Sequence, residues 1–174
     1  DFKTNWIKIM ECKILIPNDS EKYRAIRLES LLVTPDSFCT TFERENARGQ
    51  LSSQKNIEDK SENNFVVGCF EKDNLIGICG FYILPETNDI GGLVQLYVKK
   101  EYQRKGIAKQ LIKKVIEKAF LLDKVKKIQL GVLTENISVT KLYEDLGFRE
   151  YDFQKDVLMK NKKFLDLVLM ELKK

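Results

Sequence analysis

The sequence predicts an α+β fold with a mixed, mostly antiparallel central sheet of about six or seven strands flanked by helices. Three observations indicate this class. Two β-favouring runs, 65–70 and 75–84, are joined by a short polar turn, which is typical of an antiparallel hairpin. A strand, helix and strand succession covers residues 93–133 and follows this antiparallel block, so the sheet is expected to be mixed. The tail predicts a closing hairpin with strands at 148–153 and 163–172.

The first third of the chain predicts one strand followed by helices. The strand covers residues 12–16, and a helix over 18–32 starts at the polar residues Asn-Asp-Ser-Glu, which are typical of helix N-termini. Pro35 ends this helix because proline cannot continue its hydrogen-bond ladder. We expect a second, weaker helix over 40–48. The polar segment 46–64 predicts a further short helix with mobile flanks.

Length and composition indicate one globular domain. The chain has 174 residues, 43% hydrophobic and 32% charged, which is enough apolar material for a core. We expect residues 10–174 to form a single domain and residues 1–9 to be an N-terminal extension, native or left from expression. The first residues of the chain lack the basic-then-apolar layout of a signal peptide. No apolar run approaches the roughly 18 residues of a membrane span. A membrane role is therefore not expected.

The cysteines predict a reduced, cytoplasmic protein without a metal site. Cys12, Cys39, Cys69 and Cys79 lie far apart, and the chain contains no histidine. Zinc sites favour close cysteine pairs, usually with histidine. Cys69 and Cys79 fall within apolar strand residues, so we expect small core side chains there.

Positive charge is concentrated in one segment. The whole chain carries +4, whereas residues 99–127 alone carry +8, from 11 basic and three acidic residues. Such a segment can indicate nucleic-acid binding. However, its aromatic residues are not interleaved to stack on bases. We therefore expect no nucleic-acid partner.

Residues 93–122 form the segment around which the chain is organised. An apolar run, 93–98, leads into a basic turn that ends at Gly106, and an amphipathic helix follows. The first N–H groups of a helix lack partners within the helix and carry partial positive charge, so they bind anions. Arg104, Lys105 and Lys109 add charge nearby. The alternative is an ordinary strand-to-helix turn with a solvated basic rim.

This turn resembles the Gln/Arg-x-x-Gly-x-Gly/Ala signature of the GCN5-related N-acetyltransferases, and the strand before it resembles their fourth strand. The signature residues here are Gln103, Arg104, Lys105, Gly106, Ile107 and Ala108, and the strand residues are Leu96, Tyr97 and Val98. The resemblance implies that this region, with Lys109, binds acetyl-coenzyme A through its pyrophosphate.

A second segment, 136–148, resembles the second motif of the same family. There the resemblance implies that Asn136 contacts acetyl-coenzyme A and that Tyr143 is the general acid for the departing thiolate. The alternative for Tyr143 is a packed aromatic on a short helix. Residues 27–38 also resemble a bacterial branch of the family, in which this part forms a wall of the acceptor cleft. The resemblance covers nearly all of 10–174.

The expected chemistry is acetyl transfer by direct attack of a primary amine within a ternary complex. The backbone at 96–98 is expected to stabilise the developing oxyanion. Family positions for a general base are occupied here by Gly131 and Gln95, neither of which can accept a proton. The sequence therefore does not assign the general base. The candidates are a water relay and the carboxylates Glu43, Glu45, Glu86 and Glu101.

Two functions remain open from the sequence. The first is an N-acetyltransferase acting on an amine of a small molecule or a protein, as a monomer or homodimer. The second is a catalytically silent coenzyme A-binding module that serves as a sensor or interaction domain, because fold alone does not settle function. The retained Asn136 and Tyr143 favour the enzyme.

Overall fold

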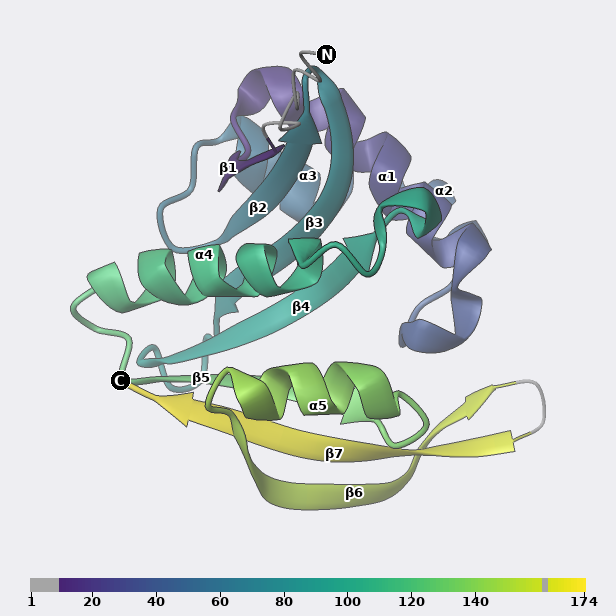
Figure 1. Ribbon diagram of the computed structural model, residues 1–174, viewed down its shortest axis with the longest axis vertical. Coiled ribbons are helices and arrows are strands. Elements are labelled where there is room, and N and C mark those ends of the chain that lie inside the picture. The colour runs from purple at the N-terminus through teal and green to yellow at the C-terminus, as the bar shows by residue number, and fades with distance from the viewer. Residues whose placement is uncertain (1–9, 161–162) are drawn as a thin grey trace, which may run out of the picture.

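The computed structural model describes residues 10–160 and 163–174, which form a seven-stranded sheet with helices on both faces (Figure 1). The strands are β1 (Met10–Ile14), β2 (Phe65–Glu71), β3 (Asn74–Ile83), β4 (Ile90–Val98), β5 (Lys127–Leu133), β6 (Arg149–Lys160) and β7 (Lys163–Lys173). The helices are α1 (Ser20–Val33), α2 (Phe42–Asn46), α3 (Ser52–Glu58), α4 (Ile107–Leu121) and α5 (Ile137–Asp145). The sheet order is β1-β2-β3-β4-β5-β7-β6, and every pairing is antiparallel except β4 with β5. The predicted fold class is confirmed.

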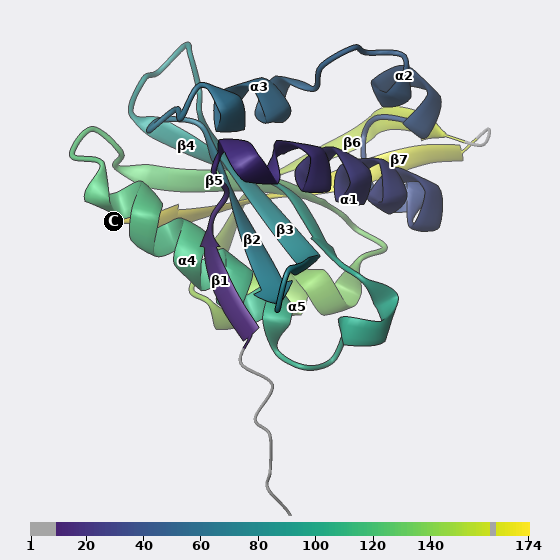
Figure 2. The ribbon, with the colours of Figure 1, turned by 90° about the horizontal axis from the view of Figure 1, so that it is seen from above.

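The helices divide between the two faces of the sheet. Seen from above, α1, α2 and α3 lie on one face and α4 and α5 on the other (Figure 2). A core cluster under α4 includes Leu111, Ile112 and Val115, all fully buried. A second cluster joins Tyr23 and Ile26 of α1 to the opposite face. Among residues 10–160 and 163–174, no helix combines the length and hydrophobicity needed to cross a bilayer.

Strand β4 begins at Ile90, three residues before the predicted start. Gly91 and Gly92 resemble a loop in the sequence, but they pair with β3. The rings of Phe81 and Tyr82 lie over them: a Cβ on Gly91 would stand 2.2 Å from the Phe81 ring, and one on Gly92 2.4 Å from the Tyr82 ring. The glycines therefore belong to the strand because cross-strand aromatics occupy the space of their missing side chains.

Other boundaries also differ from the sequence prediction. Strand β1 lies two residues earlier than expected, and β6 continues to Lys160 through an irregular stretch between Gln154 and Leu158. Asp19 does not cap α1 with its side chain; its Oδ2 instead accepts the Ile16 N–H at 3.0 Å and closes the preceding turn. The expected extension 1–9 and the hairpin turn at 161–162 lie outside the described residues.

The parallel pairing of β4 with β5 is short. It covers only Ile90–Gly92 against Lys127–Gln129. Beyond it β4 stays paired with β3 as far as Val98, and β5 stays paired with β7 as far as Leu133. The two central strands therefore separate toward their C-terminal ends, and this separation creates the space for a site.

The helix α4 provides a test of the core. Leu111 is fully buried, whereas Leu121 on the same helix is 67% exposed. We expect Leu111→Ala to lower the free energy of unfolding by about 3 kcal/mol, because it removes buried methyl groups and leaves a cavity. Leu121→Ala should change it by less than about 0.5 kcal/mol. Urea unfolding of both variants measures this, and equal losses would contradict the described packing.

Candidate active site

A cavity of about 440 Å³ lies between the diverging ends of β4 and β5. Strand β4 contributes its walls from Leu93 to Val98, and β5 contributes Gly131, Val132 and Leu133. Further lining residues come from α4, α5, β7 and the turns beside them: Gln103, Ala108, Asn136, Val139, Tyr143 and Leu167. The segment after α1 supplies Thr34, Ser37, Phe38 and Cys39. Residues from both sequence motifs thus meet at one cavity.

A bulge in β4 interrupts the sheet beside this cavity. The register slips between Ile78–Gly80 of β3 and the facing part of β4, and Gln95 has φ +60°. Such a left-handed conformation is uncommon for a residue other than glycine and marks a constrained position. Gln95 and Leu96 fall within this slip, whereas Tyr97 and Val98 stay paired with Ile78 and Gly77 of β3. On its other edge the segment 95–98 lies beyond the pairing with β5, which ends at Gly92, so its backbone borders the cavity at the position expected for an oxyanion donor.

The Tyr97 side chain is engaged elsewhere. Its hydroxyl lies 3.3 Å from Oε1 of Glu29 on α1. Burial, followed by the charge of Glu29, raises the pKa of Tyr97 to about 12. Val98 packs in the core under α4, and Leu96 is half-buried against the same core. The segment 96–98 can therefore serve the cavity through its backbone rather than its side chains.

The turn before α4 contains two residues in the left-handed backbone conformation. Gly106 is the helix N-cap with φ +76°, and Arg104 has φ +61°. A Cβ on Gly106 would meet no atom within 4 Å, so the approach to the helix start is open. The Gln103 side chain donates to the Val98 carbonyl at 3.0 Å and ties the turn to β4. The buried Ile107 anchors the first helical turn in the core.

The basic residues of the turn differ in position. Lys105 places its ammonium 5.4 Å from the centre of the Tyr102 ring. Arg104 and Lys109 are exposed. The first intrahelical bond of α4 from the cap runs from the Gln110 N–H to the Gly106 carbonyl. The N–H groups before Gln110 therefore face outward with partial positive charge, as an anion requires.

The second motif positions Asn136 and Tyr143. Asn136 is the N-cap of α5; its side chain makes no cap hydrogen bond and lines the cavity. Tyr143 is only 5% exposed, and its ring meets Phe148 edge-on at 5.6 Å. Burial, followed by the proximity of Cys79, raises the pKa of Tyr143. Its phenol therefore stays protonated across the neutral range, and Tyr143 is one of the residues that line the cavity.

The predicted site residues thus fall into two groups. Leu96, Tyr97, Val98, Gln103, Ala108, Asn136 and Tyr143 line the cavity. Arg104, Lys105, Gly106, Ile107 and Lys109 form the turn and first helical residues next to it. The sequence did not identify Val139 and Leu167 as lining residues, because only tertiary packing brings α5 and β7 to this point. The sequence did indicate that the segment after α1 lines the cavity, because residues 27–38 resemble the part of the family that forms a wall of the acceptor cleft.

Comparison with known proteins identifies the family. The sequence profile described as "Acetyltransferase (GNAT) family" matches residues 21–148. The chain belongs to the acetyltransferase (GNAT) family. Its predicted fold, its function as an N-acetyltransferase and acetyl-coenzyme A as cosubstrate are thereby confirmed.

Individual relatives agree with this family. The spermine/spermidine N(1)-acetyltransferase of Bacillus subtilis is 27% identical over 141 residues, which cover 73% of this chain and 93% of that protein. The spermidine N(1)-acetyltransferase of Vibrio cholerae is 38% identical over 98 residues, covering 55% of this chain and 54% of that protein. The yncA protein of Salmonella typhimurium, solved with its cofactor acetyl-CoA, superimposes with a TM-score of 0.78 at 18% identity, covering 95% of this chain and 94% of that one.

Gly106 provides the test of the turn in this GNAT chain. We expect acetyl-coenzyme A to raise the melting temperature, because a ligand that binds only the folded state stabilises it by mass action. Gly106→Val should abolish this rise, because its side chain would fill the open approach to the helix start.

The control is Gly49→Val, at an exposed glycine that also has no atom within 4 Å of a built Cβ. This variant should retain the full rise. Differential scanning fluorimetry of both proteins, first without and then with the ligand, makes the comparison. A folded Gly106→Val protein that still responds fully would remove the turn from the binding site.

Proposed function

We propose that this protein transfers the acetyl group of acetyl-coenzyme A to a primary amine of a polyamine, by direct attack in a ternary complex. One observation carries the proposal: the two GNAT motifs border a single cavity where β4 and β5 separate. The polyamine acceptor is supported by the Bacillus and Vibrio relatives, whose names specify spermine or spermidine.

The turn from Gln103 to Lys109 would hold the pyrophosphate. The unpaired N–H groups at the start of α4 and the absent side chain of Gly106 suit a phosphate that approaches the backbone closely. Arg104 and Lys109, both exposed, would add attraction for the phosphates. Gln103 would act indirectly, by fixing the turn to the Val98 carbonyl.

The bulged segment of β4 and Tyr143 would act on the reacting thioester. Backbone N–H groups within 96–98 would donate to the oxygen on which negative charge develops, and donors fixed before the reaction stabilise it most. Tyr143 would donate its phenolic proton to the sulfur as the thiolate departs. Asn136 would position the cofactor beside this phenol, since both side chains line the same cavity.

The acceptor would enter along the wall formed after α1. Thr34, Ser37 and Phe38 line the cavity there. A donor and an acceptor bound side by side react without the entropic cost of a bimolecular encounter. We also propose that residues 10–174 act as one domain in a reducing cytoplasm, which the four free cysteines support.

Tyr143→Phe tests the assigned acid. It keeps the ring and its edge-on contact with Phe148 and removes only the hydroxyl. We expect kcat with spermidine to fall by roughly 100-fold, with little change in acetyl-coenzyme A affinity, because the proton is needed only when the thiolate departs. Free-thiol release and mass spectrometry of the product measure this.

The control is Tyr151→Phe, at a tyrosine 44% exposed on β6, which should keep the wild-type rate. A Tyr143→Phe enzyme with unchanged kcat would show that another group supplies the proton. Failure of the wild type to acetylate spermidine, with turnover on an unrelated amine, would overturn the polyamine acceptor.

A further inference from the structure

Gln95 is the centre of a polar cluster at the acceptor side of the cavity. Its Oε1 accepts the Tyr23 hydroxyl at 2.7 Å, and its Nε2 lies 3.5 Å from Oγ of Ser53. These contacts, made by residues of α1 and α3, fix the amide beside the bulge. An amide has no charge, so Gln95 can orient an amine but cannot attract an ammonium ion by charge.

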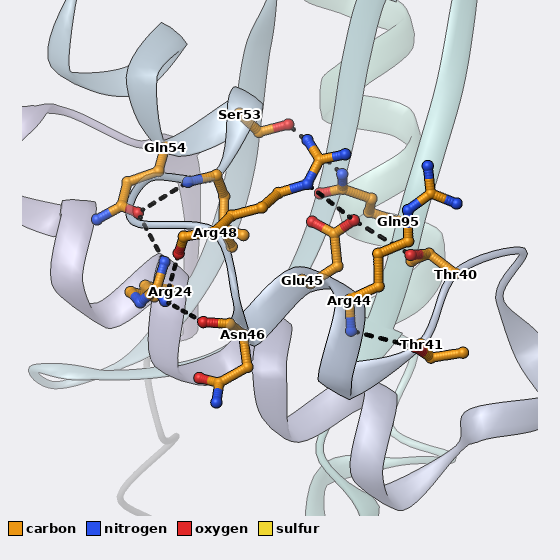
Figure 3. A network of polar contacts seen from close by, with 11 residues as sticks. Arg24, Thr40, Thr41, Arg44, Glu45, Asn46, Arg48, Ser53, Gln54 and Gln95 are labelled. Carbon is orange, nitrogen blue, oxygen red and sulfur yellow. Dashed lines mark hydrogen bonds and ion pairs between the residues drawn. The ribbon is translucent and has the colours of Figure 1, made fainter.

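Glu45 brings a negative charge to this cluster. In Figure 3 its carboxylate points toward the region where Gln95, Ser53 and Arg48 meet. Burial raises the pKa of Tyr23, the hydroxyl partner of Gln95, and the negative charge of Glu45 adds a smaller rise. Thr40, next to the lining residue Cys39, donates to Oε1 of Glu45 at 3.1 Å. The carboxylate is therefore one residue removed from the cavity lining, which it approaches through Thr40 beside Cys39.

Glu45 is also more shielded from solvent than the other candidate carboxylates. Its side chain is only 16% exposed. Glu43, Glu86 and Glu101 are all exposed, and Glu86 lies in the connection before β4, at the end of that strand away from the bulge. Shielding matters because solvent and salt weaken exposed charges far more than partly buried ones.

The cations around Glu45 differ in how firmly they are held. Arg48 on the loop after α2 is 44% exposed and places Nε 3.8 Å from Oε1 of Glu45, which is the geometry of a weak ion pair. Arg27 on α1 is buried, and its guanidinium lies 4.7 Å from the centre of the Phe38 ring. The charge of Glu45 also acts on Arg27, which burial and the Phe38 ring hold in place. The exposed Arg48 is therefore the cation that an incoming ammonium can displace.

We infer that Glu45 is the specificity-determining carboxylate that binds the protonated acceptor at the Gln95 end of the cavity, in exchange for Arg48. The inference rests on the proposed function, because it requires a cationic amine as acceptor. A polyamine carries more than one ammonium group. One of these pairs with Glu45 while the amine that reacts reaches the thioester beside the β4 bulge.

Two variants of the same ion pair test this assignment. Glu45→Gln removes the binding charge, so KM for spermidine should rise about tenfold while kcat stays within about twofold. Arg48→Gln removes the competing cation, so KM should fall about threefold. If the Glu45–Arg48 ion pair were only structural, the two variants would change KM in the same direction, because each of them breaks the pair. The opposite signs therefore distinguish binding from scaffolding.

Three further measurements complete the experiment. Glu11→Gln, at an exposed carboxylate on β1 outside the cavity lining, should leave KM unchanged. Gln95→Glu in the Glu45→Gln background should recover most of the lost affinity, because it returns a carboxylate to the same end of the cavity. The thermal response to acetyl-coenzyme A should be retained by every variant, which shows that each is folded and binds the cofactor.

The outcomes separate the inference from the proposed function. If the wild type acetylates spermidine but Glu45→Gln and Arg48→Gln change KM in the same direction, the role of Glu45 is wrong and the proposed function stands. A loss in kcat with unchanged KM would also overturn the binding role. If the wild type acetylates no polyamine, the acceptor class fails, and the inference fails with it.

Discussion

The early separation of β4 from β5 is the constraint on which the rest of the structure depends. Each strand keeps its outer neighbour, so the sheet stays continuous while its centre opens after three paired residues on each strand. Buried backbone groups without partners are costly, so strands that part in this way need a ligand or solvent between them. The helix α4 and the helix α5 cover this opening from one face and bring the start of each helix to it.

The two glycine-dependent features follow from that opening. Gly91 and Gly92 lie at the last point where β4 and β5 still pair, with the Phe81 and Tyr82 rings filling the space above them. Gly106, at the other end of the same strand-to-helix unit, adopts a left-handed conformation that leaves the approach to α4 clear. One end of the unit is thus closed by aromatic packing, and the other end leaves the start of α4 accessible.

The sequence was sufficient to predict an element where its local pattern and its tertiary packing favour the same structure. The apolar stripe predicted α4, and the second motif indicated the short helix α5, which is followed by Gly147 with φ +98°. Cys69 and Cys79 are buried core residues, as expected. The start of β4 was missed because its glycines act through rings on another strand. The proximity of Glu45 to Gln95 could not be predicted either, since the two residues are far apart in the sequence and only the folded chain brings them together (Figure 3).

Amide hydrogen exchange with and without acetyl-coenzyme A is the most direct test of the central claim, that the ligand lies where β4 and β5 separate. A second, larger cavity of about 720 Å³ borders residues 14–18 and 118–122, at the opposite end of α4. The account predicts slowed exchange at 95–98 and 103–109, with little change at the larger cavity. Slowing confined to 14–18 and 118–122 would contradict it.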